Sequence, residues 1–71
     1  MRRDALLDEL SRVERDVVEG ERQLAEQEAL LIALKKENGD LGKAQATLDS
    51  LREDQRLREQ DRQRLLSLLH P

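Results

Sequence analysis

The feature that most constrains the fold is a row of mostly apolar side chains spaced alternately three and four residues apart along almost the whole chain. The row breaks once, at Asn38-Gly39-Asp40, and then resumes. This 3.5-residue period places the row on one side of an α-helix and is typical of helices that pack as in a coiled coil. The positions of this seam are Leu6, Leu10, Val13, Val17, Gly20, Leu24, Gln27, Leu31 and Leu34, then Leu41, Ala44, Leu48, Leu51, Gln55, Arg58, Arg62, Leu65 and Leu69.

The seam predicts two long helices, from about residue 4 to 37 and from about residue 41 to 69, in a single domain of 71 residues. Asp4 is expected to cap the first helix by accepting hydrogen bonds from its free amides. Gly39 is expected to take the left-handed conformation that closes a helix, and Asp40 to cap the second helix. Because so short a connection makes neighbouring helices antiparallel, we predict an all-α fold, an antiparallel two-helix hairpin resembling a coiled coil.

Folding the chain about Gly39 predicts a register in which Gly20 faces Arg58 and Leu24 faces Gln55. Glycine in the middle of a helix costs about 1 kcal/mol relative to alanine. Gly20 is therefore expected to make room, either for Arg58 or Arg62 of the second helix or for the close approach of another backbone or a bulky side chain.

Three seam positions of the second helix, Gln55, Arg58 and Arg62, are polar where an apolar side chain is expected. Two interpretations of this polar layer stay open. The arginines could form ion pairs that fix the register or the oligomeric state, or they could recognise an acidic partner or RNA. The carboxylates within expected reach are Asp16, Glu19 and Glu21.

Further apolar residues lie beside the seam and widen the apolar side of each helix. They are Leu7, Val18, Ala25, Leu30, Ile32, Leu57, Leu66 and Leu68. A two-helix seam fully buries few side chains, whereas ordering the chain costs about 1.5 kcal/mol per residue. We therefore expect these residues to pack against a partner outside the hairpin. The simplest partner is a second copy, in a homodimer that forms a four-helix bundle, and the alternative is a different protein.

Several classes of function are disfavoured by the composition. The chain has no cysteine, its only histidine is His70, and it has no Glu-x-x-His pair of the kind that builds di-metal sites in helical bundles. We expect no enzyme activity, cofactor, metal or small-molecule substrate. The longest apolar run, Ala29 to Leu34, is six residues, against the roughly 20 that a membrane span requires. Without cysteines or an export signal, the cytoplasm is the expected location.

Nucleic acid is the alternative partner, because the second helix carries several arginines. Their charge is offset by acids at helix-pair spacing, as in Glu53 with Arg56 and Asp54 with Arg58. The net charge is −3 and no aromatic residue is present to stack on bases. Helix packing with protein partners is the leading interpretation, and an RNA-binding bundle or a subunit of a heteromeric helical assembly is the alternative.

Two stretches of the chain carry a resemblance. They are Val17-Val18-Glu19-Gly20-Glu21-Arg22-Gln23-Leu24-Ala25-Glu26-Gln27-Glu28 and Asp61-Arg62-Gln63-Arg64-Leu65-Leu66. The sequence resembles a group of short, uncharacterised bacterial proteins, mostly alphaproteobacterial, that share a Glu-Gly-Glu-Arg stretch, a Gly-x-Asp-type turn and an Asp-Arg-x-Arg-Leu-Leu ending. The resemblance implies a helical hairpin and supplies no function.

Overall fold

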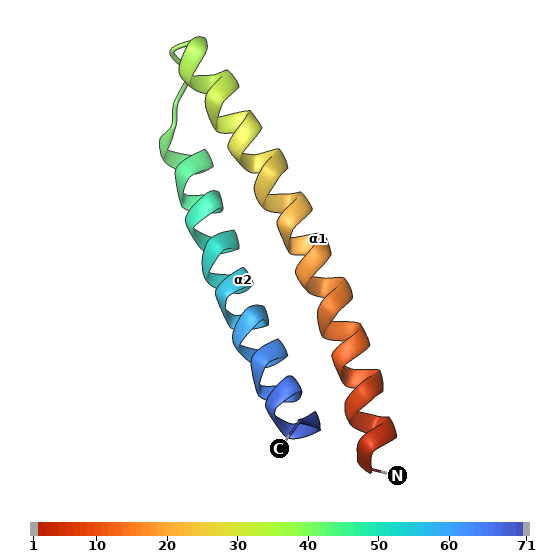
Figure 1. The fold of residues 1–71 in the computed structure, drawn as a ribbon. Helices are drawn as coiled ribbons and strands as arrows, with labels where there is room; N and C mark the ends of the chain where they lie inside the picture. Colours follow the sequence, from red (N-terminus) through yellow and green to blue (C-terminus); the bar gives the residue numbers. More distant parts are fainter. Residues whose placement is uncertain (1, 71) are drawn as a thin grey trace.

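The computed structural model describes residues 2–70, which form two helices, α1 (Arg2–Lys36) and α2 (Gly42–Leu69). The helices lie side by side and run in opposite directions, so that both ends of the chain lie at the same end of a rod 55 Å long and 14 Å wide (Figure 1). The predicted all-α hairpin is confirmed. No helix within residues 2–70 is long and apolar enough to cross a membrane.

The start of α1 differs from the prediction. The helix already includes Arg2, so Asp4 lies inside its first turn and does not cap it. A carboxylate in the first turn still interacts favourably with the helix dipole, as do Lys35 and Lys36 in the last turn.

The turn is closed by Asn38, and the prediction that Gly39 takes the left-handed conformation is wrong. Asn38 has a φ of 57°, whereas no glycine of the described residues has a positive φ. The amide of Gly39 donates to the carbonyl of Leu34 at 2.8 Å, and the amide of Asn38 donates to that of Lys35 at 3.3 Å. These two bonds form the Schellman arrangement, in which the left-handed residue comes directly before the residue that makes the longer-range bond.

The early reversal at Asn38 changes how the two helices align. Gly39, Asp40 and Leu41 run back beside the last turn of α1 before α2 begins, as the thin connection in Figure 1 shows. The predicted cap at Asp40 is wrong, because the N-cap of α2 is Leu41 and no side chain caps the helix. Asp40 lies one residue earlier, and its Oδ1 accepts a hydrogen bond from the amide of Gly42 at 2.9 Å. Because the chain reverses before Gly39, α2 contacts residues of α1 nearer the N-terminus than predicted.

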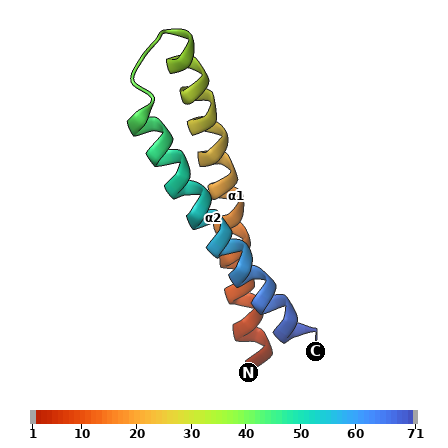
Figure 2. The ribbon, with the colours of Figure 1, turned by 90° about the vertical axis from the view of Figure 1, so that its left-hand side faces the viewer.

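The core lies along the seam. Five apolar side chains are buried, and Leu48 and Leu65 among them are fully enclosed; the five are Val17, Ala44, Leu48, Leu65 and Leu69. The other apolar seam positions are half-buried, namely Leu6, Leu10, Val13, Leu24, Leu31, Leu34, Leu41 and Leu51. The helices cross at a shallow angle in the middle of the hairpin (Figure 2), which spreads this modest burial along the whole rod.

The left-handed turn residue gives a first prediction. Alanine is disfavoured at positive φ by roughly 1–2 kcal/mol, whereas asparagine and glycine tolerate it. We expect Asn38→Ala to lower the free energy of unfolding by about 1 kcal/mol and Asn38→Gly to leave it equal or higher. Urea unfolding followed by circular dichroism at fixed protein concentration measures both. If Asn38→Ala were as stable as the unsubstituted chain, this account of the turn would be wrong.

Candidate interaction surfaces

A polar contact lies in the middle of the seam, where Gly20 of α1 meets Gln55 of α2. Gln55 is only 8% exposed. Its Nε2 donates to the backbone carbonyl of Val17 at 2.9 Å, and its Oε1 accepts from Arg58 Nη1 at 3.4 Å. Both ends of the amide are therefore used, which offsets the cost of burying it.

Gly20 makes this contact sterically possible. A Cβ at Gly20 would lie 1.9 Å from Gln55 Oε1 and 2.8 Å from Arg58 Nη1. The expectation that Gly20 makes room for Arg58 is therefore correct in part, because Gln55 approaches more closely. The predicted pairing of Gln55 with Leu24 is wrong: Gln55 lies at Val17 and Gly20, about one helical turn away.

The ion pairs predicted for the polar layer also differ. Arg62 Nε lies 3.6 Å from Glu14 Oε1 and pairs with none of the three predicted carboxylates, Asp16, Glu19 and Glu21. Arg58 contacts the Gln55 amide, and among the described residues its expected pair with Asp54 does not form. Both arginines are half-buried. The guanidinium group of Arg58 lies in the seam at Gly20, whereas that of Arg62 reaches out to Glu14.

A second glutamine repeats the arrangement nearer the turn. Gln27 of α1 donates through Nε2 to the carbonyl of Ala44 in α2 at 3.4 Å. Each helix thus sends one glutamine to a backbone carbonyl of the other. The sequence placed Gln27 in the seam but gave no signal for this bond, because a backbone carbonyl leaves no mark in the residue pattern.

The predicted outer face remains largely uncovered in the hairpin. Val18 and Ile32 of α1 are 65% and 57% exposed, and Ala25 between them is also exposed. These three residues follow one another at seven-residue intervals and so form one line along α1, which we call the outer line. At 100° per residue the outer line lies roughly 130° around α1 from the seam.

Of the other predicted face residues, only Leu7 shares the side of the outer line. Leu30 is exposed on the opposite side of the seam and lines a groove beside the turn with Leu34 and Ala44. On α2, Leu57 and Leu68 are exposed but separated by a polar stretch, and Leu66 is half-buried. Leu7 lies on the same side of α1 as the outer line, but it stands about three turns before Val18, with the polar residues Ser11 and Glu14 between them. The widened apolar side predicted from the sequence is therefore one short line and several single leucines.

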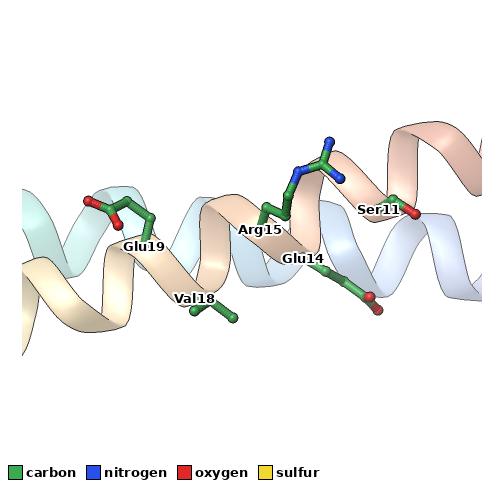
Figure 3. Close-up of a pocket in the computed structure, with 5 residues that line it drawn as sticks. All are labelled: Ser11, Glu14, Arg15, Val18 and Glu19. Atoms are coloured by element: carbon green, nitrogen blue, oxygen red, sulfur yellow. The ribbon is translucent and has the colours of Figure 1, made fainter.

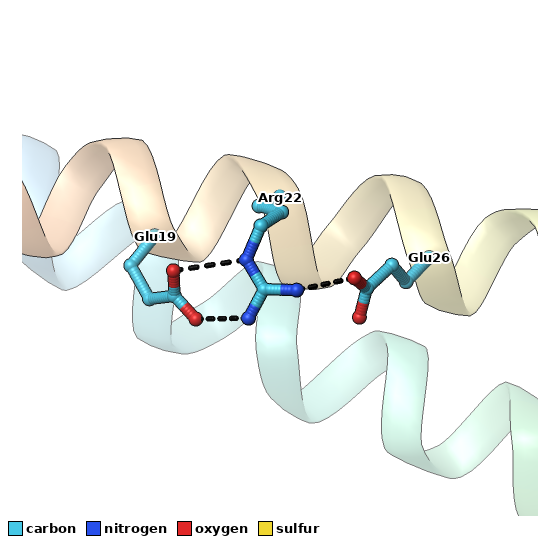
Figure 4. Close-up of polar contacts among 3 residues, drawn as sticks. All are labelled: Glu19, Arg22 and Glu26. Carbon is cyan, nitrogen blue, oxygen red and sulfur yellow. Dashed lines mark hydrogen bonds and ion pairs between the residues drawn. The ribbon is translucent and has the colours of Figure 1, made fainter.

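Exposed ion pairs border the outer line. Arg22 lies between Glu19 and Glu26 and contacts both carboxylates (Figure 4), its Nε donating to Glu19 Oε2 at 2.9 Å. The hydrogen bond from Arg22 lowers the pKa of Glu19 and raises that of Arg22 itself. On α2 the hydrogen bond between Glu53 and Arg56 shifts their pKa values in the same directions. Such solvated pairs add little stability but keep these surfaces polar.

The surface depressions lie on a single helix or between the two helices. One is lined only by residues of a single helix face, Ser11, Glu14, Arg15, Val18 and Glu19, whose side chains point in different directions (Figure 3). Within residues 2–70 no three His, Cys, Asp or Glu side chains are placed to hold a metal ion. The arrangements that the structure offers are surfaces for packing.

Comparisons with known proteins add no family to this description. The sequence matches no protein-family model, and neither curated proteins nor solved structures show significant similarity to it. A function for the hairpin therefore has to be argued from its own seam and outer line.

Proposed function

We propose that the chain is a small, non-enzymatic interaction module that acts through helix packing in the cytoplasm, and that it pairs with a second copy of itself. The outer line of α1 is the contact surface in this proposal, and two paired hairpins form a four-helix assembly. The observation that carries the proposal is the exposure of Val18 and Ile32, 65% and 57%, on one side of a single helix.

The small core supports association. Among residues 2–70 only five apolar side chains are buried, and a chain of this size gains only about 3–5 kcal/mol from a single core. Burying a Val or Ile side chain fully contributes about 1.5–3 kcal/mol. A second hairpin on the outer line covers two such side chains from each copy. Although Val18 borders Glu59 and Arg62 of α2, it remains 65% exposed, so that α2 leaves the line accessible.

The choice of a second copy as the partner rests on the chemistry of the outer line. The small residue Ala25 lies midway between the two larger side chains, so two α1 helices can approach closely there. Of the exposed glutamates beside the line, Glu19 and Glu26 pair with Arg22, and Glu14 and Glu28 lie within 4 Å of Arg62 and Arg52. Among the described residues Glu21 has no ion pair, so repulsion between two copies is reduced but not removed. The arginines of α2 mostly contact acids or Gln55, which disfavours the alternative of an RNA surface.

Sedimentation equilibrium at micromolar concentration tests the proposal. The unsubstituted chain should sediment at twice its 8.2 kDa mass, and Ile32→Asp should sediment as a folded monomer. Leu57→Asp is the matched control, because Leu57 is similarly exposed but lies on α2, and it should remain dimeric. A helical monomer for the unsubstituted chain would exclude self-association and leave a different protein as the partner.

A further inference from the structure

The apolar seam alone does not fix how far α2 sits along α1. Its residues recur every three or four positions, so sliding one helix by a turn brings apolar side chains opposite one another again. The connection can absorb such a shift in either direction, by winding residues 39–41 into α2 or by unwinding its first turn, where Gly42 is a poor helix former. The register predicted from the apolar pattern and the one observed differ by about one turn, with Gln55 at Leu24 in the first and at Gly20 in the second.

Within the seam, the two registers differ in their polar contacts rather than in their apolar ones. In the observed one, Gln55 occupies the space that a Cβ at Gly20 would fill, with its Oε1 1.9 Å and its Cδ 2.9 Å from that position. The same placement brings Nε2 to 2.9 Å from the carbonyl of Val17. Gly20 is the only glycine within α1, so no other position of that helix leaves this space.

We propose that Gly20 and Gln55 select the register of the hairpin. In a shifted register the Gln55 side chain meets a residue that has a Cβ and loses the Val17 carbonyl, so its Nε2 is buried without that acceptor. Its Oε1 keeps Arg58, which lies three residues along in the same helix. A buried amide nitrogen without an acceptor disfavours that register even where the apolar contacts are equally good. A single buried polar residue has the same effect in coiled coils, where it specifies one register at some cost in stability.

The proposal has a consequence for the polar groups around Gln55. Arg58 accompanies Gln55 into the space at Gly20, and Arg62 reaches Glu14 from the same stretch of α2. Both contacts depend on the register, so they are secondary to the fit of Gln55 at Gly20. The selection concerns one hairpin and holds whether or not two hairpins associate.

A double-mutant cycle tests the coupling between the two residues. Alanine is a better helix former than glycine, so Gly20→Ala should raise the urea midpoint when the added Cβ displaces no neighbouring side chain. We expect Gly20→Ala to lower the midpoint in the unsubstituted chain and to raise it in a Gln55→Ala background. Gly42→Ala is the control and should shift the midpoint equally in both backgrounds, because its Cβ would approach only Asp40 Oδ1, at 3.3 Å. A rise for Gly20→Ala in both backgrounds would overturn the proposal.

The register itself can be read from a distance between spin labels. The chain has no cysteine, so Ser11→Cys and Ser50→Cys label one exposed site on each helix, far apart along the rod. Labelled chain diluted into an excess of unlabelled chain reports only distances within one hairpin. We expect one narrow distance in the otherwise unsubstituted chain and a second distance, shifted by about one helical turn of 5 Å, with Gln55→Ala. A single unchanged distance with Gln55→Ala would also overturn the proposal.

Discussion

We expect Leu65→Ala to lower the free energy of unfolding by about 2–5 kcal/mol, the range for removing a buried leucine side chain. Leu65 is 0% exposed, and it is one of two fully enclosed side chains in the hairpin. A chain of this size has a core worth only about 3–5 kcal/mol, so the substitution should leave much of the population unfolded. The loss of the helical circular dichroism signal at 25 °C, and the urea midpoint where one remains, measure the effect.

Leu57→Ala is the matched control, because it removes the same atoms from a side chain on α2 that is 51% exposed. Surface substitutions generally change stability by about 0.5 kcal/mol or less, so this variant should unfold close to the unsubstituted chain. Equal losses for the two variants would mean that the seam does not hold the hairpin together in the way described.

The two helices could be predicted because their periodicity is a direct product of helix geometry. A 3.5-residue spacing sustained on both sides of one break allows little besides two packed helices. The register could not be predicted from the spacing, because it depends on which of two adjacent residues is left-handed and, in our proposal, on the fit of Gln55 at Gly20. Asn38 and Gly39 are both suited to that conformation, and the choice of Asn38 moves the reversal of the chain.

For the polar contact in the middle of the seam, the sequence predicted which residues are unusual but not which residues they contact. Gly20 and Gln55 both stand out in the sequence as exceptions within an apolar row. The prediction paired Gly20 with Arg58 and Gln55 with Leu24, because it used only the spacing from the turn. The bond from Gln55 to the Val17 carbonyl involves a backbone atom, which no residue pattern reports. If Gly20 of one helix is placed opposite Gln55 of the other, the observed register follows from that pair.

The outer line was not predicted as a separate surface, because the sequence prediction did not assign each apolar residue to one side of its helix. The apolar residues outside the seam were grouped by composition, although helix geometry separates them: Val18, Ala25 and Ile32 share one side of α1, whereas Leu30 lies on the other. Exposure in the structure and the seven-residue interval together define the line.

The stability of the hairpin should depend on protein concentration if two copies pair through the outer line. When a dimer unfolds in one step to two chains, a hundredfold rise in concentration raises the apparent free energy of unfolding by about 2.7 kcal/mol per dimer. We expect the urea midpoint of the unsubstituted chain to rise accordingly between micromolar and hundredfold higher concentrations. A monomer unfolds at a midpoint that does not change with concentration.

The substitution that removes the dependence identifies the surface. Ile32→Asp places a charge in the outer line, where pairing would have to bury it, so its midpoint should become independent of concentration while its helical signal in the absence of urea is retained. Leu57→Asp carries the same charge on α2 and should keep the dependence of the unsubstituted chain. If both aspartate variants lost the dependence equally, association would involve α2 as well, and the assignment of the contact to α1 alone would be incorrect.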